Sequence, residues 1–168
     1  MDKEQFIRTV AQEQESLRRF LRVLCGGDSF RADDIAQEAL LKAYLSFEKF
    51  QGRAKFSTWL FRIAYNCWYD SARTSSAREV VSLDEVGSDR PDDSADAAAG
   101  FQRQDLRLAV SALSEAERIV VLLFYMEDKT VKDIEAITGM PSGTVRSHLF
   151  RARKHLREYL DRLGYGRP

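Results

Sequence analysis

One segment divides this chain and limits what it can fold into. Residues 79–100, EVVSLDEVGSDRPDDSADAAAG, contain seven acidic residues against one arginine, with a proline, two glycines and no aromatic residue. Such a stretch buries too little apolar surface to offset the entropy lost on ordering. We therefore predict an acidic linker at 79–100 between two small domains, 1–78 and 101–168. As a flexible coil the linker would span roughly 25 Å.

Both flanking parts are predicted to be helical, which makes the fold all-α. The chain has only three prolines and nine glycines, and strand-like alternation of apolar and polar residues is almost absent. Gly26-Gly27 is expected to end the first helix, and a cap at Asp28 or Ser29 begins the second. Further caps are expected at Ser57, at the S-x-x-E capping box of Ser114 and Glu117, over Thr130–Asp133 and at Ser142. Helical periodicity restarts after the linker at Phe101. The other predicted helices cover residues 3–24, 29–49, 57–78, 115–126, 131–138 and 142–160.

Charge is distributed unevenly along a chain whose formal net charge is zero. Residues 141–168 carry seven basic against two acidic residues, and residues 53–78 carry five against one. These basic parts are where an anionic partner would bind. The two cysteines, Cys25 and Cys67, lack metal-ligand spacing and are expected to be buried free thiols in a reducing cytosol. No signal-peptide pattern or long apolar run is present, so a cytoplasmic location is expected.

The C-terminal part has the pattern of a helix-turn-helix: a short helix, a turn that contains glycine and a basic helix. Small residues at the start of the last helix would allow close approach to a phosphate or a base edge. A solvated basic face is the alternative, but Phe150 lies in the middle of the polar side, where it has no core to enter and could meet a thymine methyl group. We therefore favour recognition of duplex DNA. The apolar side consists of Val145, Leu149, Ala152 and Leu156, and the polar side of Arg146, Ser147, Phe150, Arg151, Lys154 and Arg157.

The second helix has two leucines on its polar side. Leu41 and Leu45 fall among Asp34, Gln37 and Glu38, which suggests a groove-binding face for a partner protein. Incidental exposure and a wider core are alternatives that periodicity leaves open. The predicted core face consists of Ile35, Ala36, Ala39, Leu40, Ala43, Phe47 and Phe50.

The third helix is rich in aromatic residues, most of which must be core in a domain of this size. Arg62, Asn66, Tyr69 and Arg73 nevertheless share one stripe, beside the basic loop 51–55. Cations and rings side by side are typical of surfaces that bind single-stranded nucleic acid. A core role is equally compatible with the pattern.

Two long stretches resemble one protein family. DDIAQEALLKAYLSFEKFQGRAKFSTWLFRIAYNCWYDSAR resembles region 2 of the extracytoplasmic-function (ECF) sigma factors of bacterial RNA polymerase, and LSEAERIVVLLFYMEDKTVKDIEAITGMPSGTVRSHLFRARKHLREYL resembles their region 4. The order of the parts, the acidic linker and the length also match. The resemblance implies a sigma factor that directs promoter-specific transcription initiation.

The resemblance further implies three binding sites, carried over by position. The second helix would bind core polymerase at the clamp coiled coil of its largest subunit, through Asp34, Gln37, Glu38, Leu41 and Leu45. The following loop and helix would hold the non-template strand of the −10 element, through Phe50, Arg53, Lys55, Arg62 and Asn66. The last helix would read the −35 duplex, through Thr144, Arg146, Ser147, Phe150 and Arg151.

Other implied partners are the polymerase flap and an anti-sigma factor, which in this family is often membrane-anchored, and the linker would run toward the RNA exit path. No catalytic residue, metal, cofactor or small-molecule substrate is expected. The chain departs from the family pattern at His148, where arginine is frequent, and at Glu135, where a small residue is usual.

Two other functions are compatible with parts of the sequence. Asp33, Asp34 and Glu38 could suggest a metal-dependent nuclease, but Asp33 points away from the other two, and no acid or cysteine ligand accompanies His148 or His155 in the sequence. A free-standing DNA-binding regulator would share the last helix but leaves the aromatic stripe and the leucines unexplained.

Overall fold

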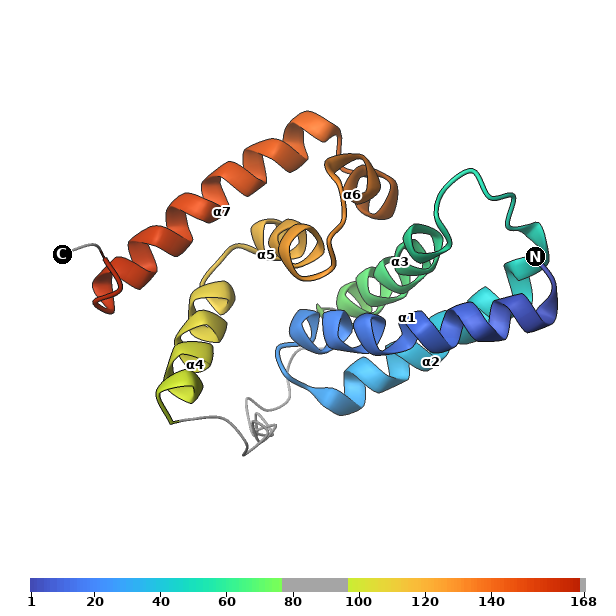
Figure 1. Ribbon diagram of the computed structural model, residues 1–168, viewed down its shortest axis with the longest axis horizontal. Coiled ribbons are helices and arrows are strands. Elements are labelled where there is room, and N and C mark those ends of the chain that lie inside the picture. Colours follow the sequence, from blue (N-terminus) through green and yellow to red (C-terminus); the bar gives the residue numbers. More distant parts are fainter. Residues whose placement is uncertain (77–96, 167–168) are drawn as a thin grey trace. The chain divides into compact units, whose positions relative to one another are not determined.

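The computed structural model describes residues 1–76 and 97–166, and no strand occurs among them. Its helices confirm the all-α prediction (Figure 1). The N-terminal part contains α1 (Lys3–Leu24), α2 (Ser29–Ser46), the 3₁₀ turn η1 (Phe47–Lys49) and α3 (Phe56–Ser76). The C-terminal part contains α4 (Ala97–Ser111), α5 (Glu115–Val121), the π-helical segment η2 (Leu122–Met126), α6 (Val131–Thr138) and α7 (Ser142–Arg162).

The helix ends of the N-terminal part follow local side-chain chemistry. Asp2 and Gln5 form a reciprocal capping box that begins α1. Gly26 and Gly27 both adopt positive φ, the left-handed conformation that ends a helix at little cost for glycine. Asp28 is the residue that caps α2, because its side chain accepts from the amide of Arg31. The predicted cap at Ser57 is wrong: α3 begins one residue earlier, at Phe56.

The helices α1, α2 and α3 each pack against the other two and enclose one core. Leu17, Phe20 and Leu21 of α1 meet the small residues of α2 and the rings of α3, with the rings of Phe20 and Phe61 5.4 Å apart. The alanines of α2 allow this close approach between helices. Of its predicted core face, Leu40 and Phe50 are only half-buried, whereas the remaining members are buried: Ile35, Ala36, Ala39, Ala43 and Phe47.

Most of the predicted linker lies outside the described residues. Helix α4 begins at Ala97, so residues 97–100 are helical rather than coil. The periodicity had placed the start of this part at Phe101, because three alanines and a glycine carry no apolar pattern.

An arginine joins α4 to α5. The guanidinium of Arg118 donates to the carbonyl oxygens of Val110, Ser111 and Leu113, where α4 ends and its last carbonyl groups lack helical partners. Ser114 caps α5 through the amide of Glu117, as predicted. The predicted single helix to Met126 is wrong in detail, since the last turn widens into η2.

The elements of the helix-turn-helix lie close to their predicted bounds. Thr130 and Asp133 cap α6 reciprocally, each side chain accepting from the other's backbone amide at 3.1 Å. Gly139 follows α6 with a φ of 77°. The predicted cap at Ser142 is wrong by one position, because Pro141 precedes the first helical residue. Helix α7 packs against α4 and α5 and buries Val145, Leu149 and Ala152.

Two sequence expectations concern thiols and membranes. Both cysteines are free; Cys67 is buried and Cys25 is half-buried. Burial raises the pKa of the Cys25 thiol to about 11. No helix in the described ranges is long and apolar enough to cross a membrane.

Candidate nucleic-acid and partner-protein interfaces

The outer side of α7 carries the residues predicted to read duplex DNA. Phe150 is 70% exposed, which confirms that this ring has no place in the core. The predicted residues around it are exposed as well: Thr144, Arg146, Ser147 and Arg151. Because Val145 and Leu149 are buried on the opposite side, the orientation of the helix about its axis is fixed by packing. The outer side of α7 therefore presents these side chains together on one helix of fixed rotation.

Contacts within α7 constrain two side chains on this face, Ser147 and Arg151. The hydroxyl of Ser147 donates to the carbonyl oxygen of Gly143 at 3.0 Å, one turn earlier. The Nη2 atom of Arg151 lies 3.2 Å from Nδ1 of His148. His148 is half-buried and thus orients Arg151, which is a role that the sequence pattern did not indicate.

Helix α7 is attached to the rest of the C-terminal part by two contacts that the sequence analysis missed. Glu117 of α5 is 5% exposed, and its carboxylate lies 3.0 Å from Nδ1 of His155. The contact gives His155 the structural role expected for it, and the residues beside it in the sequence did not indicate this partner, because Glu117 lies 38 residues away in the chain. The second contact is that of Arg153, whose guanidinium donates to the hydroxyl of Tyr125 at 2.5 Å and lies over the rings of Phe124 and Tyr125.

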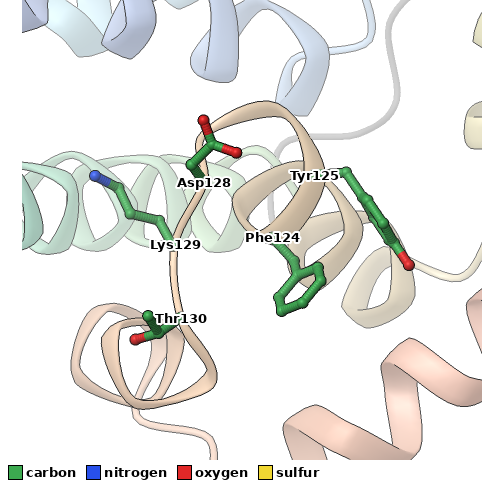
Figure 2. A pocket seen from close by; sticks show the side chains of 5 residues that line it. All are labelled: Phe124, Tyr125, Asp128, Lys129 and Thr130. Atoms are coloured by element: carbon green, nitrogen blue, oxygen red, sulfur yellow. The ribbon is translucent and has the colours of Figure 1, made fainter.

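The segment after α5 forms a hollow that no sequence pattern predicted. Figure 2 shows Phe124 and Tyr125 projecting from η2, while Asp128, Lys129 and Thr130 lie along the loop that leads to α6. Asp128 has a φ of 51°, which is uncommon for a residue other than glycine and lets the chain turn sharply there. The hollow depends on the π-helical turn of η2, and the periodicity of the sequence does not indicate such a turn.

The polar side of α2 presents the predicted partner-binding residues. Leu41 and Leu45 are 58% and 73% exposed, so the alternative of a wider core does not hold. Asp34, Gln37 and Glu38 are also exposed, and Lys42 pairs with Glu38 at 2.9 Å. Phe30, in the first turn of α2, is 86% exposed and was not predicted to belong to this side. Eleven residues separate Phe30 from Leu41, close to three helical turns, so both fall on the same side.

The third helix exposes the stripe of Arg62, Asn66, Tyr69 and Arg73. A core role for these four residues is therefore excluded, and the core of α3 is formed by other residues, among them Phe61 and Trp68. The guanidinium carbon of Arg73 lies 5.6 Å from the centre of the Tyr69 ring, within the range of a cation–π contact.

The loop before α3 combines exposed cations with a cluster of rings. Arg53 and Lys55 are exposed. Phe50 is half-buried, with its ring centre 5.7 Å from that of Phe56 and 5.2 Å from that of Trp59. Phe50 thus belongs to a packed cluster and keeps part of its surface in solvent.

The acids considered for a metal site are held in separate contacts. Asp33 pairs with Arg18 at 2.9 Å, and Glu38 pairs with Lys42. Among the residues that the structure describes, no group of three or more His, Cys, Asp or Glu side chains is placed to hold a metal ion.

Comparisons with known proteins match both halves of the chain. Residues 9–78 match the family model for Sigma-70 region 2, and residues 103–156 match that for Sigma-70, region 4. The chain is 30% identical over 148 residues to the ECF RNA polymerase sigma factor SigW of Bacillus subtilis, covering 80% of this chain and 78% of that protein. It is 32% identical over 143 residues to the ECF RNA polymerase sigma factor SigL of Mycobacterium tuberculosis, covering 84% and 81%.

Solved structures share the fold of this chain. The sigma factor RpoE of Bartonella quintana, in complex with the anti-sigma factor NepR, superposes with a TM-score of 0.81 at 26% identity, over 94% of this chain and 98% of that one. CnrH in complex with the cytosolic domain of CnrY has the same fold, with a TM-score of 0.70 at 22% identity, over 95% and 90% of the two chains.

Proposed function

This chain belongs to the ECF sigma factors of bacterial RNA polymerase, and on that basis we propose how its surfaces divide the work of transcription initiation. The protein is a non-enzymatic factor that directs promoter-specific initiation together with core RNA polymerase and promoter DNA. The proposed domains are region 2 at residues 1–78, the acidic linker at 79–100 and region 4 at 101–168. We place its action in the cytoplasm, where polymerase meets the chromosome.

The exposed side of α2 binds the clamp coiled coil of core polymerase. Two leucines that are more than half exposed, set among carboxylates and an amide, have the composition of an interface with an apolar centre and a polar rim. The core of the described residues does not include these leucines, because α2 buries a separate alanine-rich side. The binding residues are Asp34, Gln37, Glu38, Leu41 and Leu45.

The exposed side of α3 and the loop before it hold the separated non-template strand of the −10 element. Cations at Arg53, Lys55 and Arg62 follow the phosphates, and the amide of Asn66 can donate and accept at a base edge. Phe50 offers the exposed part of its ring to a base, from a cluster that keeps it in place.

The outer side of α7 reads the −35 element as duplex. The single observation that carries this assignment is the exposed Phe150 between Arg146 and Arg151 on a helix whose rotation is fixed by its buried side. Arginine can donate two hydrogen bonds to a guanine edge, and an apolar ring can meet a thymine methyl group. A free-standing regulator would use α7 alone and would leave the exposed sides of α2 and α3 without a role.

An anti-sigma factor is the proposed regulatory partner. The sigma factor RpoE, at 26% identity, was solved in complex with the anti-sigma factor NepR, and CnrH, which has the same fold, was solved in complex with the cytosolic domain of CnrY. The polymerase flap is the proposed partner of region 4.

The test is transcription in vitro with core polymerase, the full chain and a genomic library, with start sites read by sequencing. A sigma factor yields start sites that share spaced −35 and −10 elements and that vanish without the chain. Tight, specific binding of the chain alone to a duplex, with no new start sites, would favour the free-standing regulator.

A further inference from the structure

The exposed stripe of α3 continues for about two turns beyond Asn66, to two residues with no assigned role. Tyr69 follows Asn66 by three positions and Arg73 follows Tyr69 by four, which is helical spacing, so both share the side of the helix that carries Asn66. From Asn66 to Arg73 the axis advances about 10 Å. Any strand that follows the stripe would pass over them.

Tyr69 is held in place from the core side. Its ring stacks on that of Tyr65, with centres 6.1 Å apart and planes inclined by 27°. Tyr65 is buried and contacts the buried indole of Trp68, with centres 5.8 Å apart. Tyr69 itself is 44% exposed. The ring is therefore a fixed surface and loses little conformational freedom when a ligand binds.

The guanidinium of Arg73 completes a ladder of planar groups. Tyr65, Tyr69 and Arg73 follow one another at intervals of four residues, and Arg73 lies over the Tyr69 ring. A planar cation above a ring matches two features of an unpaired nucleotide at once, because the base can stack while the guanidinium binds a phosphate. A structural role alone does not require the cation, since Tyr65 already supports the ring.

We propose that Tyr69 and Arg73 form a stacking site for one unpaired base of the open promoter strand, next to the base contacted by Asn66. This inference rests on the proposed function of α3 and extends it, because it adds a nucleotide to the strand that region 2 holds. The base would stack between the Tyr69 ring and the Arg73 guanidinium, and the charge of Arg73 would remain near the phosphate of that nucleotide.

The experiment measures binding of single-stranded promoter oligonucleotides to the holoenzyme, with 2-aminopurine placed at each position of the −10 element in turn. Stacking on a tyrosine ring quenches this fluorophore, so the reporter identifies the base at the site. Tyr69→Phe keeps the ring and should bind as the unaltered chain does. Tyr69→Leu keeps apolar bulk but removes the ring, and should weaken binding roughly 5- to 100-fold, with quenching lost at one position.

Two further variants separate stacking from charge. Arg73→Lys keeps the charge and removes the planar group, so it should also reduce quenching at that position. Arg73→Gln should likewise reduce quenching at that position and should also lower the salt dependence of binding. Tyr44→Leu is the matched control, because Tyr44 is also 44% exposed and no cation of the described residues is placed over its ring. Thermal melting of each variant shows whether it folds.

The outcomes are separable from those of the parent proposal. If the unaltered chain brings no strand binding to the polymerase, the function proposed for α3 fails. If the unaltered chain binds and Tyr69→Leu binds and quenches equally well, only the stacking site is overturned. A change confined to the salt dependence in Arg73→Gln, with Arg73→Lys unaltered, would reduce Arg73 to a phosphate contact and would also overturn the proposal.

Discussion

Nδ1 of His155 on α7 lies 3.0 Å from Oε2 of Glu117 on α5, and the carboxylate is buried whereas the imidazole is about half exposed. This contact joins the helix that is proposed to read DNA to the helix on which it packs. Because the two partners differ in burial, their removal should have unequal effects. Substitution of His155 and substitution of Glu117 should therefore lower the free energy of unfolding by different amounts.

His155→Ala leaves the Glu117 carboxylate buried without this partner, which should lower the free energy of unfolding by about 1–3 kcal/mol. Glu117→Gln keeps an oxygen and a donor at the same place and removes the buried charge, so its loss should be smaller. Chemical denaturation of both variants measures the difference. Equal losses would show that the buried carboxylate gains little from His155.

Leu41→Glu and Leu45→Glu should weaken binding to core polymerase by about 2 kcal/mol or more each, because a charge replaces an apolar contact at the interface. Both side chains are exposed, so the melting temperature should hardly change. Competition against a labelled sigma factor gives the affinity. Ile7→Glu on α1, also an exposed apolar position, is the control and should leave the affinity unchanged. A large fall in melting temperature would show that the leucines are structural.

Asn66→Ala should reduce strand opening without loss of stability, since Asn66 is exposed. Phe50→Ala should reduce both strand opening and the stability of the fold, because the Phe50 ring also packs on Phe56 and Trp59. The loss of one base contact should cost about 1–3 kcal/mol. Permanganate footprinting on a promoter reports the opening, and thermal melting separates the two effects. Normal opening in both variants would contradict the −10 assignment.

Arg146→Ala should relax the preference at one base pair of the −35 element, at a cost of about 1–3 kcal/mol. Lys154→Ala should weaken binding to all sequences alike and reduce the salt dependence, because Lys154 lies two turns further along α7 and is placed for phosphates. Promoter activity across a library randomised in the −35 element distinguishes the two. A uniform loss in both variants would show that Arg146 does not read sequence.

Burial raises the pKa of Cys25 from 9.0 to about 11, so the folded state keeps this proton at pH values where the unfolded chain releases it. The stabilising contribution is present below pH 9 and is lost as the pH rises toward 11. At pH 8, alkylation of Cys25 should be roughly 100-fold slower in the folded protein than in the denatured one. Peptide mapping after timed iodoacetamide treatment measures this rate. Equal rates would mean that the thiol is open to solvent.

The sequence by itself determined the helices and their two sides. The intervals of three and four residues that bury Val145 and Leu149 and expose Phe150 are a property of the local chain, and so is the stop at Gly26-Gly27. The same reasoning identified the exposed stripe of α3 and the leucines of α2, although periodicity could not separate exposure from a wider core. Local patterns suffice here because a helix is built from bonds between residues four positions apart.

Only the tertiary structure decided which groups from distant parts of the chain meet. The pattern S-x-x-E predicted that the Glu117 side chain returns to its own helix end, but burial against α7 placed it beside His155 instead. Likewise, Phe50 was predicted both for a buried face and for a strand contact, and its packing on Phe56 and Trp59 leaves the ring half-buried, with part of its surface in solvent. These outcomes depend on how helices pack, because a buried charge or ring takes whichever partner lies within reach, at any distance along the chain.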